Sequence, residues 1–178
     1  IALTVALLAG LLPIASQAGA LRIVKAETSL VEKVYRLSAE IQYELNEQML
    51  DALHNGVAIA MAIDISIYRE RNYWWDEHIA SPKQIYQIRY RALTKQYMLK
   101  NLNTGFIDHF SRIDQVLEKI SVIDKFPLVD SNLLARKGNY YTLIRTRLDV
   151  ESLPVPLRLR AYANSNWNLK SSWYLCRM

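Results

Sequence analysis

The fold of this chain is decided by residues 57–68, which read VAIAMAIDISIY. Large apolar side chains recur at every second position of this segment, and five of those six residues are β-branched. Alternation with a period of two is typical of a β-strand that buries one face, and β-branched residues favour the pleated backbone. The segment therefore predicts a long central strand with one face entirely in a core.

A second strand is expected close behind the first. The chain leaves the central strand through polar residues 69–72 and an aromatic cluster, Tyr73-Trp74-Trp75-Asp76. Apolar and polar side chains then alternate again over residues 86–92. We expect the rest of the chain to supply the strands that pair with these two.

Shorter alternating segments lie on both sides of this pair. They cover residues 21–29, 35–43, 97–99, 106–110, 140–148, 157–161 and 167–173. One helix is predicted between a cap at Asn46 and an end at Gly56. A second helix is predicted after a cap at Ser111, with Asp114 at its third position and an apolar stripe over residues 113–120. Residues 127–132 predict an irregular connection.

These segments predict an all-β fold with two short helices. We expect roughly seven to nine strands, without the alternation of strands and helices that parallel sheets require. Short turns favour antiparallel pairing in a two-layer β-sandwich, immunoglobulin-like in general architecture, with a helix over each open end. No repeat or linker divides residues 21–178, so we expect a single domain there.

The N-terminal segment Ile1–Ala20 predicts export. It carries no charge and ends in Ala18-Gly19-Ala20, the small-x-small pattern of a signal-peptide cleavage site. A buried helix and an uncleaved membrane anchor are the alternatives, since about 20 residues can span a bilayer. Cys176 is the only cysteine, so we expect a fold that depends on its core and not on an internal disulfide.

The sequence shows no motif for catalysis, cofactor binding or metal binding. The three histidines, His54, His78 and His109, lack ligand spacing, and no glycine-rich loop or G-x-S-x-G motif is present. The formal net charge of +5 permits attraction to polyanions without establishing it. We therefore expect no cofactor, no metal site and no catalytic residues.

Aromatic residues form the first candidate interaction site. Trp74 and Trp75 are consecutive, so on an extended chain only one of them can point inward. Trp167 and Trp173 share one face of the predicted last strand. Docking to a protein or membrane interface is one interpretation, and core and edge packing is the other. The candidate residues are Tyr73, Trp74, Trp75, Asp76, Trp167 and Trp173.

Arginine pairs form a second candidate site, for anions. Three predicted strands each carry Arg-x-Arg, a spacing that places both guanidinium groups on one face of a sheet. If the strands are neighbours, they form a basic panel for phosphate or carboxylate groups. An ordinary solvated face with acidic residues across the ladder is the alternative. The residues are Arg89, Arg91, Arg145, Arg147, Arg158 and Arg160.

Three stretches carry a resemblance to a known family. They are residues 73–77 (YWWDE), 86–97 (YQIRYRALTKQY) and 167–174 (WNLKSSWY), behind the uncharged N-terminal segment. Together they resemble the Gram-negative, proteobacterial domain-of-unknown-function family four-three-nine-zero over essentially all of the mature chain. The resemblance implies a periplasmic protein without an established activity or cofactor, and a link to envelope sensing through a nitrogen-type two-component sensor kinase encoded nearby.

The sequence as a whole predicts a binding module rather than an enzyme. The first hypothesis is an envelope interaction module with a protein partner, for which a sensor kinase is one candidate. The second is binding of an anionic lipid or glycan by the arginine panel. The third is a hydrolase with an unrecognised carboxylate site. Export disfavours nucleic acid as a partner.

Overall fold

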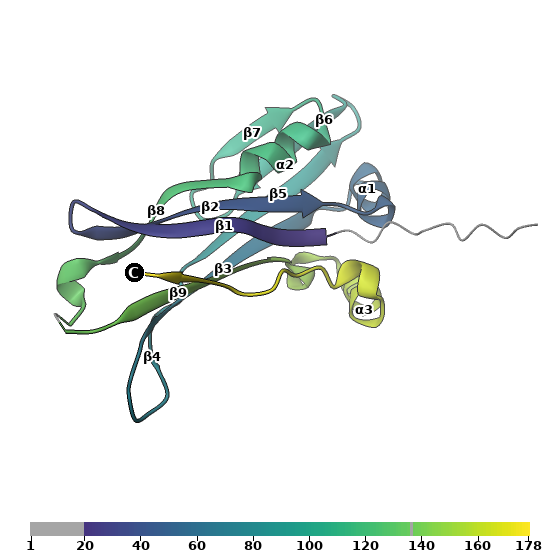
Figure 1. Ribbon diagram of the computed structural model, residues 1–178. Coiled ribbons are helices and arrows are strands. Elements are labelled where there is room, and N and C mark those ends of the chain that lie inside the picture. Colours follow the sequence, from purple (N-terminus) through teal and green to yellow (C-terminus); the bar gives the residue numbers. More distant parts are fainter. Residues whose placement is uncertain (1–19, 136) are drawn as a thin grey trace, which may run out of the picture.

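The computed structural model describes residues 20–135 and 137–178, and within them the chain forms two antiparallel sheets that do not close into a barrel (Figure 1). One sheet has the order β1-β2-β8, with β1 at Ala20–Val31, β2 at Val34–Glu44 and β8 at Val122–Asp130. The other has the order β10-β9-β3-β5-β6-β7, and β4 also pairs with β3. Its strands are β3 (Ile59–Arg69), β4 (Glu77–Ala80), β5 (Lys83–Arg91), β6 (Gln96–Asn101), β7 (Ile107–Phe110), β9 (Tyr140–Leu148) and β10 (Tyr174–Arg177). A mostly-β fold with two antiparallel sheets is confirmed.

Strand β3 is the predicted central strand. Its side chains at positions 59, 61, 63, 65 and 67 are each at most 1% exposed. On one edge β3 pairs with β9 over residues 61–69, and on the other edge it pairs with β5 and then with β4. The alternation in the sequence therefore indicated the buried face correctly, because one face of the strand packs against the core along its whole length.

The inner faces of the two sheets contribute to a single core. Leu37 and Ile41 of β2 belong to the same buried cluster as Ile63 and Ile65 of β3. A buried hydrogen bond also joins the two sheets. The hydroxyl group of Thr146 in β9 donates to the hydroxyl oxygen of Tyr43 in β2 at 3.3 Å. Strand β1 lies beside β9 and β10, so the edge of the smaller sheet adjoins the edge of the larger one.

Both predicted helices are present. Helix α1 spans Glu47–His54, and the side chain of Asn46 accepts a hydrogen bond from the backbone N–H of Met49 at 3.0 Å. Gly56 follows the helix with a positive φ of 84°, a conformation that glycine adopts without strain. Met49 and Leu53 are buried, so α1 covers one end of the core.

Helix α2 spans Ile113–Ser121 and differs from the prediction at its cap. The N-cap is Arg112, not Ser111, and the third helical position is Gln115, not Asp114. The Gln115 side chain accepts hydrogen bonds from the Arg112 backbone N–H and the Ser111 hydroxyl group. The apolar stripe is confirmed, because Val116 and Ile120 are buried.

Strands β4 and β8 were not predicted. β8 includes Pro127, which was expected to mark an irregular connection. Proline is tolerated there because β8 is an edge strand that pairs only with β2, so the missing N–H need not face a partner. β4 is a short strand directly after the aromatic cluster, and it was too short to show an alternating pattern.

The C-terminal prediction was wrong in two segments. Residues 157–161 lie in helix α3 (Val155–Ala163), where Leu157 and Ala161 are one helical turn apart and Ala161 is buried. Pro156 lies in the first turn of the helix, where its missing N–H costs nothing. Residues 167–173 form no strand, although Lys170 makes an isolated antiparallel bridge with Arg147 of β9. Strand β10 continues this pairing with β9 from Tyr174 onward. Of the predicted signal segment Ile1–Ala20, residues 1–19 lie outside the described residues, and Ala20 is the first residue of β1.

The central position of β3 predicts a large penalty for shortening its buried side chains. Ile63→Ala is expected to lower the free energy of unfolding by about 2–5 kcal/mol, because the emptied space in a packed core cannot collapse fully. Ile107→Ala, in an edge strand and 44% exposed, is the matched control and should cost less than about 1 kcal/mol. Urea unfolding followed by circular dichroism measures both, and equal losses would contradict the assignment of β3 as the centre of the core.

Candidate functional site

The candidate site is the tip of the β3–β4 hairpin, which projects beyond the two sheets (Figure 1). Tyr73, Trp74 and Trp75, which we call the aromatic tip, are 92%, 79% and 95% exposed. Neither tryptophan points inward. Alternation applies only to an extended chain, and residues 70–76 form the connection between β3 and β4.

Asp76 closes the connection at its base. One carboxylate oxygen accepts a hydrogen bond from the backbone N–H of Arg71 at 3.1 Å. The other accepts a hydrogen bond from the hydroxyl group of Tyr141 in β9 at 2.7 Å. A single side chain therefore holds both ends of the connection together and ties them to the neighbouring strand.

Aromatic stacking and ion pairs stiffen the same base. Tyr68 stacks on Tyr141 with 5.5 Å between the ring centroids and meets His78 edge-on at 5.4 Å. The carboxylate of Glu77 forms ion pairs with Arg71 at 2.7 Å and with Arg69 at 3.6 Å. We call the contacts of Tyr68, Arg71, Asp76, Glu77 and Tyr141 the hairpin brace. The brace joins the base of the hairpin to β9, below the aromatic tip.

The hydrogen bond between Asp76 and Tyr141 changes the pKa values of both groups, in opposite directions. It raises the pKa of Tyr141 to about 12, because losing the phenolic proton would remove the bond and place two negative charges together. The bonds from Tyr141 and from the Arg71 backbone lower the pKa of Asp76, because they stabilise its charged form. Asp76 is thus a structural acceptor below the tip.

The two other predicted tryptophans do not join the aromatic tip. Trp167 is 7% exposed and packs in the core. Trp173 is 43% exposed and lies against the guanidinium group of Arg145, 4.3 Å from its ring centroid. The site therefore contains Tyr73, Trp74, Trp75 and Asp76 of the predicted aromatic set, together with the unpredicted residues of the brace.

The arginine pairs do not form one panel. Arg145 and Arg147 on β9 both contact the carboxylate of Asp64 on β3, at 3.1 Å and 2.9 Å, and Arg147 also contacts Asp149. For this pair, the contacts agree with the alternative interpretation, an ordinary solvated sheet face with acidic residues across the ladder. Arg89 and Arg91 are exposed on β5, on the far side of β3 from β9.

The third arginine pair, Arg158 and Arg160, lies on helix α3 and not on a strand. The spacing argument for one shared sheet face was therefore wrong for these residues. Arg158 is within 3.4 Å of Glu151 and donates to the backbone carbonyl groups of Glu151 and Leu153. Its contacts anchor the start of the helix.

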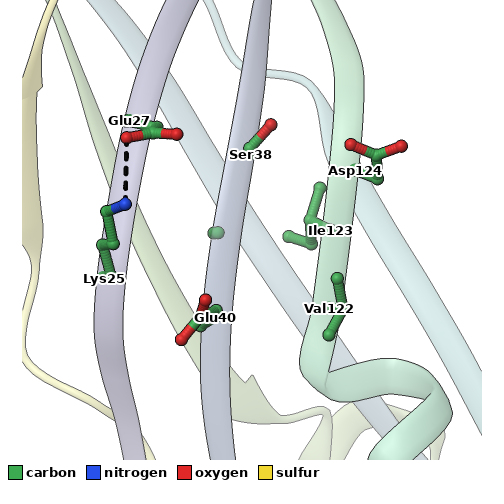
Figure 2. A pocket seen from close by; sticks show the side chains of 8 residues that line it. Lys25, Glu27, Ser38, Glu40, Val122, Ile123 and Asp124 are labelled. Atoms are coloured by element: carbon green, nitrogen blue, oxygen red, sulfur yellow. Dashed lines mark ion pairs between the residues drawn. The ribbon is translucent and has the colours of Figure 1, made fainter.

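A small hollow of about 120 Å³ lies on the outer face of the three-stranded sheet (Figure 2). Lys25 and Glu27 of β1 form an ion pair there at 3.2 Å, beside Glu40 of β2 and Asp124 of β8. Both partners of the pair are well exposed, so the contact contributes little stability. Among the described residues, no group of three or more His, Cys, Asp or Glu side chains could hold a metal ion.

The fold and the tip define a class: a mostly-β protein of two antiparallel sheets with an exposed aromatic hairpin. The chain belongs to the family described as Domain of unknown function (DUF4390), which it matches over residues 18–177. No curated protein and no solved structure matches the chain. In the part of the chain that the structure describes, no helix is long and apolar enough to cross a membrane.

The bond in the brace predicts a measurable titration. Tyr141 should titrate near pH 12 in the wild type and close to its ordinary pKa of 10.0 in Asp76→Asn. The contribution of this bond to stability is present between the ordinary pKa values of aspartate, 3.8, and tyrosine, 10.0. It is lost as the pH falls through the lowered pKa of Asp76 or rises through the raised pKa of Tyr141. NMR of ring-labelled tyrosine measures the curve, and an unchanged curve in Asp76→Asn would refute the assignment.

The ion pairs of Asp64 predict a second effect. Asp64→Asn is expected to lower the free energy of unfolding by about 1 kcal/mol, because Arg145 and Arg147 lose a partly buried carboxylate. The exposed Asp124 provides the control, and Asp124→Asn should change stability by less than about 0.5 kcal/mol. Denaturant midpoints of the two variants give the comparison. A loss no larger for Asp64→Asn than for Asp124→Asn would show that the arginines are not held by this carboxylate.

Proposed function

We propose that the protein is an exported, periplasmic binding module of the bacterial cell envelope that makes its contact through the aromatic tip. The observation that carries this proposal is the exposure of three consecutive aromatic side chains, Tyr73, Trp74 and Trp75. Large apolar side chains gathered at one exposed place are typical of interaction sites. Tyrosine and tryptophan also dominate the binding energy of many interfaces.

The hairpin brace supports the same proposal. If the aromatic side chains were exposed only because they do not fit into the core, hydrogen bonds and ion pairs at the base of their hairpin would serve no purpose. Here Asp76, Tyr141 and Glu77 hold the base of the hairpin through hydrogen bonds and ion pairs. A binding element that is already ordered loses less conformational entropy when it engages its target, which strengthens binding.

We propose as well that the two sheets form a two-layer sandwich, immunoglobulin-like in general architecture, and that residues 21–178 are one domain. The shared core of the two inner faces supports this arrangement. It provides a rigid body from which the hairpin projects. Binding without catalysis is the function that this combination supports best.

The other hypotheses have less support. An anion site on the arginine panel stays a prediction, and it is weakened because Arg145 and Arg147 already have carboxylate partners. A protein partner such as a sensor kinase and a hydrolase with scattered carboxylates also stay predictions. No arrangement of the described side chains favours either one specifically.

Hydroxyl-radical footprinting of the protein in isolated envelopes tests the proposed function. We expect modification of Trp74 and Trp75 to slow several-fold relative to the purified protein, because a bound surface covers the tip. Phe106 and Tyr162, which are 64% and 63% exposed elsewhere, serve as internal controls and should change by less than two-fold. Equal modification of the tip in both samples would overturn the proposal.

A further inference from the structure

We propose that the surface bound by the aromatic tip is the membrane–water interface of a lipid bilayer. In this arrangement Tyr73, Trp74 and Trp75 insert among the lipid headgroups while the hairpin brace stays outside. The inference rests on the proposed function, since it names what the tip contacts. It identifies the target by chemistry: a neutral, zwitterionic lipid surface.

The shape of the tip favours a lipid surface over a protein surface. The tip is a projection at the end of a two-stranded hairpin, not part of a broad face (Figure 1). Three aromatic side chains offer roughly 450–750 Å² together, at about 150–250 Å² each. A stable protein interface buries about 800 Å² on each partner, which this projection does not reach alone. A bilayer interface can surround a projection from all sides and needs no flat complementary patch.

The residue types fit the interface region of a bilayer. Tryptophan and tyrosine are enriched at headgroup level, because their rings are apolar and their N–H and O–H groups stay hydrated there. The tip contains one tyrosine and two tryptophans in sequence and no charged side chain. A segment of this kind can enter the interface without moving a charge out of water.

The charges behind the tip indicate a neutral lipid surface. Lys137 lines a hollow beside Tyr73 and Trp74. Residues 69–77 together with Lys137 contain three cationic and three carboxylate side chains. Arg69 and Arg71 both contact Glu77, so their charges are satisfied within the hairpin. We therefore expect binding that depends little on salt, unlike the binding of a polybasic patch to anionic lipid.

Tryptophan quenching by brominated lipids measures insertion directly. The full chain is mixed with vesicles of dioleoylphosphatidylcholine or its dibrominated form. The first 20 residues contain no tryptophan and Trp167 is buried, but Trp173 is 43% exposed. The measurement is therefore made in a Trp173→Phe background, in which Trp74 and Trp75 are the exposed tryptophans of the described residues. We expect a blue shift of the emission and at least about two-fold quenching, since interfacial insertion places the rings near the acyl boundary. Raising the salt from about 0.05 M to 0.5 M should change the quenching by less than about a quarter, because the contact is not ionic.

A matched pair of variants separates the tip from the rest of the chain. Tyr73→Asp, made in the same background, adds a charge to the tip and keeps both of its tryptophans. Leu93→Asp adds the same charge to the fully exposed β5–β6 turn. We expect vesicle partitioning measured by the blue shift to fall about ten-fold in Tyr73→Asp and less than two-fold in Leu93→Asp. Circular dichroism confirms that both variants fold.

The outcomes distinguish the two proposals. Absence of quenching in the Trp173→Phe background, or equal partitioning of the two variants, overturns the lipid inference. If the tip is nevertheless protected in envelopes, a protein partner binds it and the proposed function stands. If the tip is neither quenched by lipid nor protected in envelopes, both proposals fail. Binding only to anionic vesicles, abolished by salt, would assign the contact to basic side chains and also overturn the inference.

Discussion

The whole structure depends on the pairing of β3 along both of its edges. β9 takes one edge over residues 61–69, while β5 takes the other only over residues 59–64. The C-terminal end of β3 therefore extends beyond its pairing with β5. The short strand β4 covers this overhang by pairing with residues 67–69. The hairpin and its projecting tip follow from this difference in strand length.

The same pairing places the hairpin brace. Because β9 accompanies β3 to its end, Tyr141 lies directly opposite Tyr68 in the ladder. Its hydroxyl group can then reach Asp76 after the chain has turned back. Three separate segments thus meet at one polar contact, with an aromatic stack beneath it. Polar bonding can hold this projection because none of the residues of the hairpin brace is buried, so water reaches them.

The sequence predicted those parts of the fold in which a local pattern and burial agree. The alternation of β3 was reliable since a shift of one residue would expose its isoleucines. The cap of α1 at Asn46 was predictable because the contact is local. The helix over residues 157–161 was not predictable. Five alternating residues fit one face of a helix as well as a strand, and Pro156 is tolerated in the first turn of helix α3. The edge strand β8 was hidden by Pro127, which an interior strand would not tolerate.

The candidate site was predictable only in part, for a related reason. The sequence located the aromatic cluster, but the outward direction of both tryptophans depends on where the chain turns. The partners of Asp76 and Asp64 depend on strand register, which brings Tyr141 and Arg145 to them from about 65 and 81 residues away. Asp76 was among the candidate residues because it directly follows the aromatic run, but no local pattern pointed to Tyr141.

The residues that stabilise the fold and those proposed to make the contact are different in this protein. The aromatic tip contributes nothing to the core cluster, whereas Arg145 and Arg147 of β9 are held in the sheet by Asp64 and Asp149. The fold therefore places no demand on which side chains occupy positions 73–75. Small polar residues would complete the hairpin connection as well and would avoid exposing apolar rings to water. The presence of three aromatic side chains there needs a cause outside the fold, and contact with an external surface supplies one.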